Sequence, residues 1–367
     1  MATTLGRIVF LGLMLGVFAA LQGCEKPPTD SSQRGYRGTG MLQVTNPSTV
    51  EAKAASNALP QIAPPARVRA NAPLAGAVYQ NVQVLGNVSV AEFARTMDAI
   101  TAWVSPAASC AYCHVEGNFA SDDKYTKVVA RRMLQMVRHV NDDWSTHVAA
   151  TGVTCYTCHR GQPLPTEVWF KPAPQDPDPG FIGNRNGQNM PARQAGLAAL
   201  PAEVFERFLA AEPTDTSVRV ASGTALPTTS SAPVQSAEAT YALMFHLSGA
   251  LGVNCTYCHN SRAFASWEES TPQRVTAWHG LRMARDLNSN YLSPLSGTFP
   301  EIPAGRLGPL KDAAKVNCAT CHQGAFKPLL GAQMARHYPA LAPKLAAAYD
   351  AGQTVAAAPA GAQPAPK

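Results

Sequence analysis

Charge, histidine and long hydrophobic segments are all scarce in this chain of 367 residues. Asp, Glu, Lys and Arg together make up 15% of the sequence, and the formal net charge is only +6, so nucleic-acid binding is not indicated. After residue 23 no apolar stretch reaches the roughly 20 residues of a transmembrane helix, which excludes a protein with several spans. The places of the 9 cysteines and 9 histidines are therefore informative.

Four copies of the pentapeptide C-x-x-C-H contain eight of the nine cysteines. This is the attachment motif of c-type haem, in which both thiols form thioethers with the porphyrin and the histidine ligates the iron from the proximal side. Disulfides, zinc sites and thioredoxin-like exchange also use paired cysteines, but they do not explain the histidine. With 9 histidines in 367 residues, four chance placements have a probability on the order of 10⁻⁷. The sequence predicts four covalently bound c-type haems, attached at Cys110, Cys113, Cys155, Cys158, Cys255, Cys258, Cys318 and Cys321, with His114, His159, His259 and His322 as proximal ligands.

The ninth cysteine, Cys24, follows a short apolar segment that begins after Arg7. This segment, residues 8–21, is too short for a membrane span and is typical of an export signal. Its end, Leu21-Gln-Gly-Cys24, resembles a bacterial lipobox, whose cysteine is lipidated and becomes the mature N-terminus. We therefore expect a lipid anchor at Cys24 on the periplasmic face of the bacterial inner membrane. The alternative is an uncleaved signal that acts as a single helical anchor on the same face.

Composition divides the chain into helical and irregular parts. We expect a lipoprotein signal peptide (1–23), an extended N-terminal arm (24–88), a first haem pair (89–170), a connector (171–235), a second haem pair (236–338) and an Ala/Pro-rich tail (339–367). The two haem-pair parts form an internal repeat, because MVRHVN (136–141) aligns with MARDLN (283–288). The predicted fold class is mainly α: a multihaem c-type cytochrome with two pseudo-symmetric haem-pair halves and long irregular connecting segments.

A second axial ligand on each iron would leave no open position for a substrate. Met97 lies 13 residues before Cys110, on a helix predicted at 90–104 that a Ser89–Glu92 capping box begins. Met244 lies 11 residues before Cys255, again on a predicted helix. Methionine in an apolar stripe is more often part of the core than a ligand, but the repeated spacing before two motifs favours ligation.

The helix predicted at 121–148 carries two further candidates. Met133 and His147 share a face but lie about 21 Å apart along the axis, so they serve two different haems. Met136 is about 60° from Met133 on the helical wheel and is its rival, whereas His139 is about 120° away and is interpreted as a surface histidine.

The fourth motif has no ligand candidate nearby. The equivalent helix of the second half has Gly280 in the position of Met133, and no His or Met follows close to Cys318. His147, in turn, has no local iron to bind. Pairing His147 with His322 resolves both, which gives three His/Met haems and one His/His haem.

Four further segments are specific: YQNVQVLGN (79–87), VARRM (129–133), GVTCYTCHRG (152–161) and TPQR (271–274). With the lipobox and the haem motifs, the chain from Cys24 to about Pro339 resembles the tetrahaem cytochrome c subunit of the purple bacterial photosynthetic reaction centre. The resemblance implies four axial pairs, and it implies Met133 rather than Met136. The implied pairs are Met97–His114, Met133–His159, Met244–His259 and His147–His322.

The resemblance also implies a row of haems leading to the bacteriochlorophyll special pair in the reaction-centre membrane subunits. The haem of Cys255 and Cys258 would lie nearest to it, with Arg274 between that haem and the special pair. The implied function is to re-reduce the photo-oxidised special pair with electrons from a soluble periplasmic c-type cytochrome or high-potential iron–sulfur protein. No enzymatic activity is expected.

Two other functions are compatible with a multihaem sequence. A multihaem reductase would need one haem with an open distal position, and a quinol-oxidising tetrahaem cytochrome would favour His/His ligation and a true membrane helix. Three acidic pairs, at residues 122–123, 142–143 and 268–269, are candidates for docking a soluble carrier, and solvated helix faces are the alternative interpretation.

Overall fold

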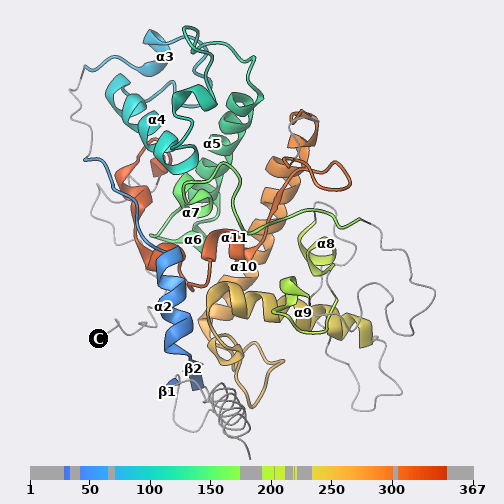
Figure 1. Ribbon diagram of the computed structural model, residues 1–367. Coiled ribbons are helices and arrows are strands. Elements are labelled where there is room, and N and C mark those ends of the chain that lie inside the picture. Colours follow the sequence, from blue (N-terminus) through green and yellow to red (C-terminus); the bar gives the residue numbers. More distant parts are fainter. Residues whose placement is uncertain are drawn as a thin grey trace, which may run out of the picture.

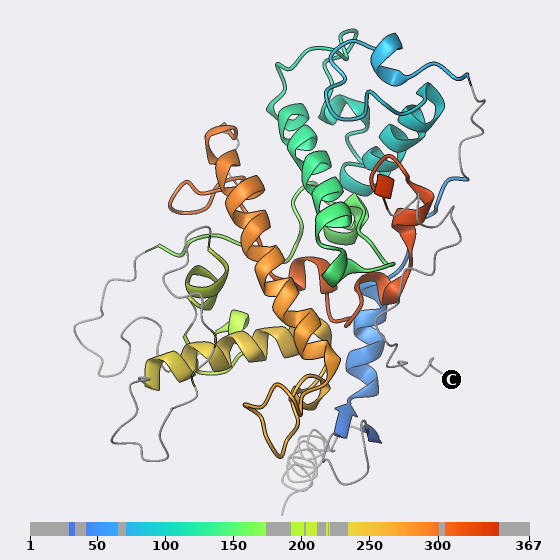
Figure 2. The ribbon, with the colours of Figure 1, turned by 180° about the vertical axis from the view of Figure 1, so that it is seen from behind.

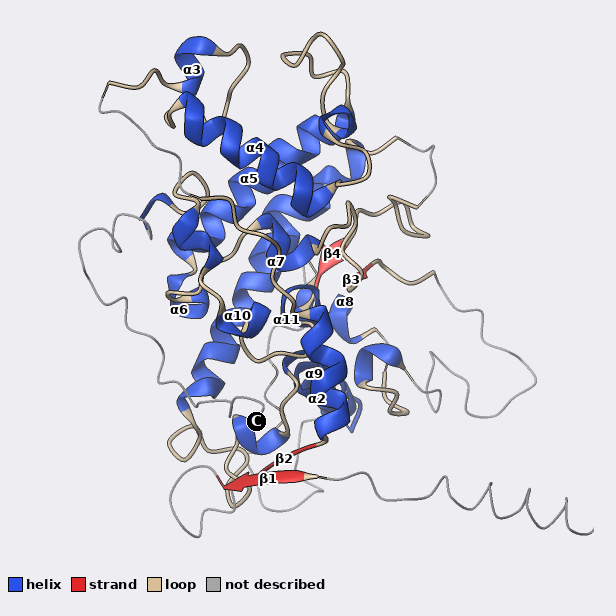
Figure 3. Ribbon diagram, turned by 60° about the vertical axis from the view of Figure 1, so that its left-hand side comes forward, coloured by secondary structure: helices blue, strands red, loops and turns tan. Residues whose placement is uncertain are grey.

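The described part of the chain is mainly helical, as predicted, with two small two-stranded sheets (Figure 3). The computed structural model describes residues 29–33, 42–64, 71–173, 192–201, 203–210, 218, 220, 234–300 and 305–344. The expected signal peptide with Cys24, most of the connector and the tail beyond residue 344 lie outside the described residues. Among the described helices, none combines the length and the apolar character needed to cross a bilayer.

The N-terminal arm contains more regular structure than the expected extended segment. Strands β1 (Asp30–Gln33) and β2 (Leu42–Thr45) pair antiparallel, and helix α2 (Pro47–Ser56) follows. Asn46 caps α2 by accepting a hydrogen bond from the Ser48 amide, with proline in the first turn, which is a normal helix start. The helix has no buried residue, so hydrophobic periodicity could not have revealed it.

The first helical part follows α3 (Ala75–Val78). Helix α4 (Val90–Val104) has the predicted bounds, and the Ser89 hydroxyl accepts a hydrogen bond from the Glu92 amide. The helix predicted at 121–148 is shorter and broken: α5 (Tyr125–Asp143) and α6 (Ser145–Val148) meet at Trp144, whose indole donates to Asp286 at 2.7 Å. Around these helices lie η2 (Cys110–Tyr112), α7 (Cys155–His159) and β3 (Val168–Trp169).

The second helical part repeats this order. Short helices η3 (Arg193–Ala195) and α8 (Val204–Leu209) precede α9 (Val234–Leu251), η5 (Cys255–Tyr257) and α10 (Pro272–Leu287). The chain then forms the π-helical turn η6 (Asn288–Leu292), η7 (Ser293–Gly297), β4 (Lys315–Val316), α11 (Cys318–His322), η8 (Pro328–Gly331) and η9 (Met334–His337). Figure 1 and the reverse view in Figure 2 place α7 and α11 in the middle of the molecule, between α4–α5 and α9.

The two helical parts share apolar cores. Trp103 of α4 packs edge-on against Tyr338 at 4.7 Å, in a cluster that also contains Cys155 and Leu341. Another cluster joins Val140 of α5 to residues 287–316, and β3 pairs with β4. Because side chains far apart in the sequence fill the same cores, neither part can keep its packing without the other.

Candidate functional site

The four C-x-x-C-H motifs adopt two local structures. The first motif of each part forms a 3₁₀ turn, η2 or η5, and the second forms a short α-helix, α7 or α11. In both short helices the third residue is a threonine that bonds back to the N-cap residue: the Thr157 hydroxyl accepts from the Thr154 amide at 2.9 Å, and the Thr320 hydroxyl accepts from the Asn317 amide at 3.0 Å. The two cysteines and the histidine, at i, i+3 and i+4, thereby face one side of the turn.

Five imidazoles in or facing the four motifs make the same hydrogen bond, and His246, outside the motifs, also bonds to the backbone, at Gln194. In each of the five, Nδ1 lies 2.8–3.1 Å from a backbone carbonyl oxygen, which can only accept, so Nδ1 carries the proton and Nε2 keeps its lone pair. This is the usual arrangement of a metal-ligating histidine. The pairs are His114 with Phe119, His147 with Thr276, His159 with Gln162, His259 with Phe264 and His322 with Ala325.

The structure brings His147 and His322 together, although they are far apart in the sequence. Their ring centroids are 6.1 Å apart and the rings are nearly perpendicular. An ion held by one nitrogen of each ring, with bonds of about 2 Å, fits between them. Burial lowers the pKa of His147, and burial together with the neighbouring His147 lowers the pKa of His322 to about 4. Both rings are thus neutral at pH 7, which is the ligating form.

Gly280 makes room for the ring of His147. A Cβ atom at residue 280 would lie 2.6 Å from His147 Cε1 and 3.1 Å from Nε2, which no packed side chain tolerates. Gly280, the position of α10 that offers no side chain as a ligand, therefore leaves the space that the ring of His147 from α6 occupies.

An apolar cavity of about 860 Å³ lies between α4, α5 and the first two motifs. Its volume is in the upper range of ligand pockets. The lining brings together every residue predicted to hold the first two haems, and it reaches Cys321 of the fourth motif as well. The predicted residues that line it are Met97, Cys110, Cys113, His114, Met133, Cys155, Cys158 and His159; Met136 lines it too. The residues present fit two haems: the cysteine thiols would bond to the porphyrin edges, and one imidazole and one methionine sulfur would be available to each iron.

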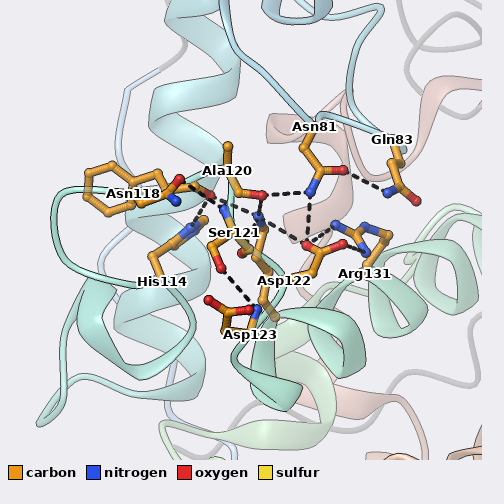
Figure 4. Close-up of polar contacts among 11 residues, drawn as sticks. Asn81, Gln83, His114, Asn118, Ala120, Ser121, Asp122, Asp123 and Arg131 are labelled. Atoms are coloured by element: carbon orange, nitrogen blue, oxygen red, sulfur yellow. Dashed lines mark hydrogen bonds and ion pairs between the residues drawn. The ribbon is translucent and has the colours of Figure 1, made fainter.

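The loop after the first motif is held in place by Asp122 (Figure 4). Arg131 donates to its carboxylate at 2.8 Å and Asn81 at 3.0 Å, and Arg131 is the main cause of its lowered pKa. Lys127 also donates to the Phe119 carbonyl, the oxygen to which His114 is bonded. Asp122 is thus engaged in holding this loop, and it is not a free docking charge.

The third motif lies at a more open place. His259 stacks on Phe264 at 5.2 Å, and burial raises the pKa of the Cys258 thiol to about 11. The guanidinium of Arg274 lies 4.2 Å from the Trp267 ring centroid, and its charge acts on both Cys258 and His259. Met244 is half-buried on α9, beside the cluster formed with α8 and α10.

The second and fourth motifs lie against each other. The Sγ atoms of Cys158 and Cys321 are 2.7 Å apart, and Arg160 donates to the Cys321 carbonyl at 3.2 Å. None of the eight motif cysteines forms a disulfide. The sides of α7 and α11 that carry these two thiols therefore face each other.

His139 differs from the five imidazoles. Its Nδ1 lies 2.8 Å from Asp143 and its Nε2 2.6 Å from Asp286, so neither nitrogen is available to a metal. The interpretation as a surface histidine needs correction, because the ring is half-buried and bridges α5 to α10.

Two residues near the sites were missed in the sequence. His246 is 8% exposed, burial lowers its pKa to about 4, and its Nε2 has no partner among the described residues. It packs on Phe205, whereas the ring that faces His322 is that of His147. Arg306 lines the large cavity and donates to the Tyr112 hydroxyl. Neither residue belongs to a motif, so no local pattern identifies them.

Comparison with known proteins supports this description. The family described as "Photosynthetic reaction centre cytochrome C subunit" matches residues 25–342. The chain is 56% identical to the photosynthetic reaction center cytochrome c subunit of Rubrivivax gelatinosus, over 93% of this chain and 91% of that protein. It is 47% identical to the subunit of Thermochromatium tepidum, over 88% and 77%, and 38% identical to that of Roseobacter denitrificans, over 94% and 95%. With its C-x-x-C-H motifs, its helical fold and these relatives, the chain belongs to the family of photosynthetic reaction centre cytochrome c subunits, electron-transfer proteins that carry covalently bound c-type haem.

Proposed function

We propose that this chain holds four c-type haems and relays electrons from a soluble periplasmic carrier to the photo-oxidised special pair of the reaction centre. One observation carries the proposal: five imidazoles share a backbone hydrogen bond from Nδ1 that leaves Nε2 free for iron. Four of the five follow a C-x-x-C pair, and the fifth, His147, faces the fourth motif. Family membership supplies the photosynthetic context.

The proposed axial pairs are Met97–His114, Met133–His159, Met244–His259 and His147–His322. The ring geometry and the space at Gly280 support the last pair. The shared cavity supports the first two. The pair on α9 rests on the repeated spacing and on the family resemblance.

Bound haem supplies reversible one-electron reduction at iron. The residues set how easily each iron accepts the electron, since a methionine sulfur opposite histidine raises the reduction potential relative to two imidazoles. His147 and His322 should therefore give the lowest potential of the four, so the row has unequal potentials. With a protein ligand on both sides of each iron, no position remains for a substrate, and we propose no enzymatic activity.

The electron path follows from which motifs are neighbours. The 2.7 Å approach of Cys158 and Cys321 supports placing the second and fourth haems side by side in the middle of the row. The first and second motifs line one cavity, which supports placing the first haem next to the second.

We propose that the third motif faces the reaction-centre membrane subunits. Phe264 is 46% exposed and Trp267 is 45% exposed, and exposed aromatic side chains that lie close together are typical of interaction surfaces. The nearby cation of Arg274 would stabilise the reduced iron there and so raise its potential. We further propose that lipidation at Cys24 holds the subunit on the periplasmic side of the photosynthetic membrane.

Flash spectroscopy on native membranes, combined with a redox titration, tests this function. A saturating flash should oxidise one haem within microseconds while the special pair is re-reduced, and the titration should resolve four one-electron components. Membranes that lack the cytochrome should keep the special pair oxidised for longer. If no haem is oxidised after the flash, the donor role is wrong, even where four haems are counted per chain.

A further inference from the structure

Arg306 reaches from the second helical part into the cavity of the first two motifs. It lies before β4 in the chain, next to Leu307, which forms an isolated antiparallel bridge with Ala313. Its side chain is half-buried, lines the cavity together with Cys113 and His159, and donates a hydrogen bond to the Tyr112 hydroxyl.

Arg306 lies near residues of both motifs. Its guanidinium donates a hydrogen bond to the Tyr112 hydroxyl, and it lines the cavity together with His159. Tyr112 stands inside the first motif and His159 ends the second, so the guanidinium lies close to both sites.

The other two cations of the cavity lining already have an anionic partner. Lys127 lies 3.2 Å from Asp122 and Arg131 lies 2.8 Å from the same carboxylate. Arg306 forms no ion pair with any carboxylate in the described ranges. A half-buried cation beside apolar surface is costly unless an anion is close to it. The cavity therefore needs an anionic group near Arg306 that the described side chains do not supply.

We propose that Arg306 binds a propionate of the haem whose proximal ligand is His159 and is a positioning residue that raises the reduction potential of this haem. This rests on the proposed function, since it requires haem at the second motif. A guanidinium binds a carboxylate through two parallel N–H bonds, which fixes the edge of the macrocycle. Its positive charge also favours the ferrous state, which holds one more electron than the ferric state.

Redox titration of the purified full-length holoprotein tests the proposal. In R306Q, one of the four reduction potentials resolved by the titration should fall by at least about 59 mV. This is a tenfold change in the equilibrium constant for one electron. R306K keeps the charge but loses the bidentate geometry, so the same component should move in the same direction by less. R193Q is the matched control, because the Arg193 side chain is 86% exposed and pairs only weakly with Glu167.

Assigning the shifted component completes the test. Met133→His should lower the potential of the haem of His159 by changing its distal ligand, and in M133H/R306Q both shifts should fall on one component. If R306Q and R306K leave all four potentials as in R193Q, or if the shift falls on another haem, the proposal is wrong. R306K decides the question if R306Q does not accumulate. The haem count and the flash oxidation of the wild type test the proposed function separately, and they can stand while this proposal fails.

Discussion

At the scale of single residues, one backbone carbonyl per histidine decides which ring nitrogen can bind iron. The five imidazoles bonded in this way occur in different elements, and His139, whose two nitrogens both meet carboxylates, is the contrast within the same chain. Cysteine spacing predicts four proximal histidines from the sequence, but only the fold shows that His147 faces His322.

Gly280 gives the sharpest prediction at this scale. Gly280→Ala should displace the ring of His147, because the added Cβ would meet Cε1 at 2.6 Å. We expect one of the four proposed haems to lose its proposed distal ligand, His147, and to give a high-spin signal in the electron paramagnetic resonance spectrum of the oxidised protein. The gain in helix propensity, up to about 1 kcal/mol, does not relieve the clash.

Gly249→Ala is the control for this substitution. Gly249 is also helical, and a Cβ atom there meets no heavy atom within 4 Å. It should keep four low-spin haems. A fully low-spin spectrum of the Gly280→Ala variant would contradict the assignment of His147 as a ligand.

At the scale of elements, local signals predicted some helices well and missed others. The capping box at Ser89 gave α4 its observed bounds, and Thr271 with Pro272 marks the start of α10. Helix α2 was missed because it buries no side chain of its own, and the break after Asp143 was missed because Trp144 bonds to Asp286, 142 residues away. Sequence periodicity reports local burial, so it cannot show a side-chain bond between distant elements.

The contact between α5 and α10 should depend on pH. Burial alone would lower the pKa of His139, but hydrogen bonds to Asp286 and Asp143 outweigh burial and raise it. A group whose folded pKa is raised stabilises the fold fully below its ordinary value of about 6.5, and this stabilisation is lost as the pH rises through the folded pKa. The charged and titratable groups around it are Arg132, Asp143, Arg282, Arg285, Asp286, Tyr291 and Lys344.

H139Q should therefore lower the free energy of unfolding at pH 6 more than at pH 9. The difference should be about 1 kcal/mol, since Asp143 is half-exposed and water screens that contact. Denaturant unfolding of the holoprotein at the two pH values measures it. H337Q is the control, because burial lowers the pKa of His337 and its pH trend has the opposite sign. An equal loss at both pH values would show that His139 is not charged in the fold.

At the scale of the whole molecule, each helical part places a side chain beside the motifs of the other. In the first part, His147 faces His322 of the fourth motif, and in the second, Arg306 lines the cavity of the first two motifs. The shared cores around Trp103–Tyr338 and Val140–Leu287 hold these long-range placements. Composition and the repeat predicted two similar parts, but they could not show how far the parts depend on each other.

This dependence makes one ligand exchange informative about the whole row of haems. His147→Met should turn the only proposed His/His site into a His/Met site, and methionine raises the potential relative to imidazole. The lowest of the four potentials should rise by at least 59 mV, a tenfold change in the equilibrium constant of one electron. Four haems should remain attached, because Cys318 and Cys321 are unchanged. A redox titration measures this, with His139→Met as the control that should leave all four potentials in place. If the lowest component persists in the His147→Met variant, the low-potential site belongs to another haem and the pairing across the two parts is wrong.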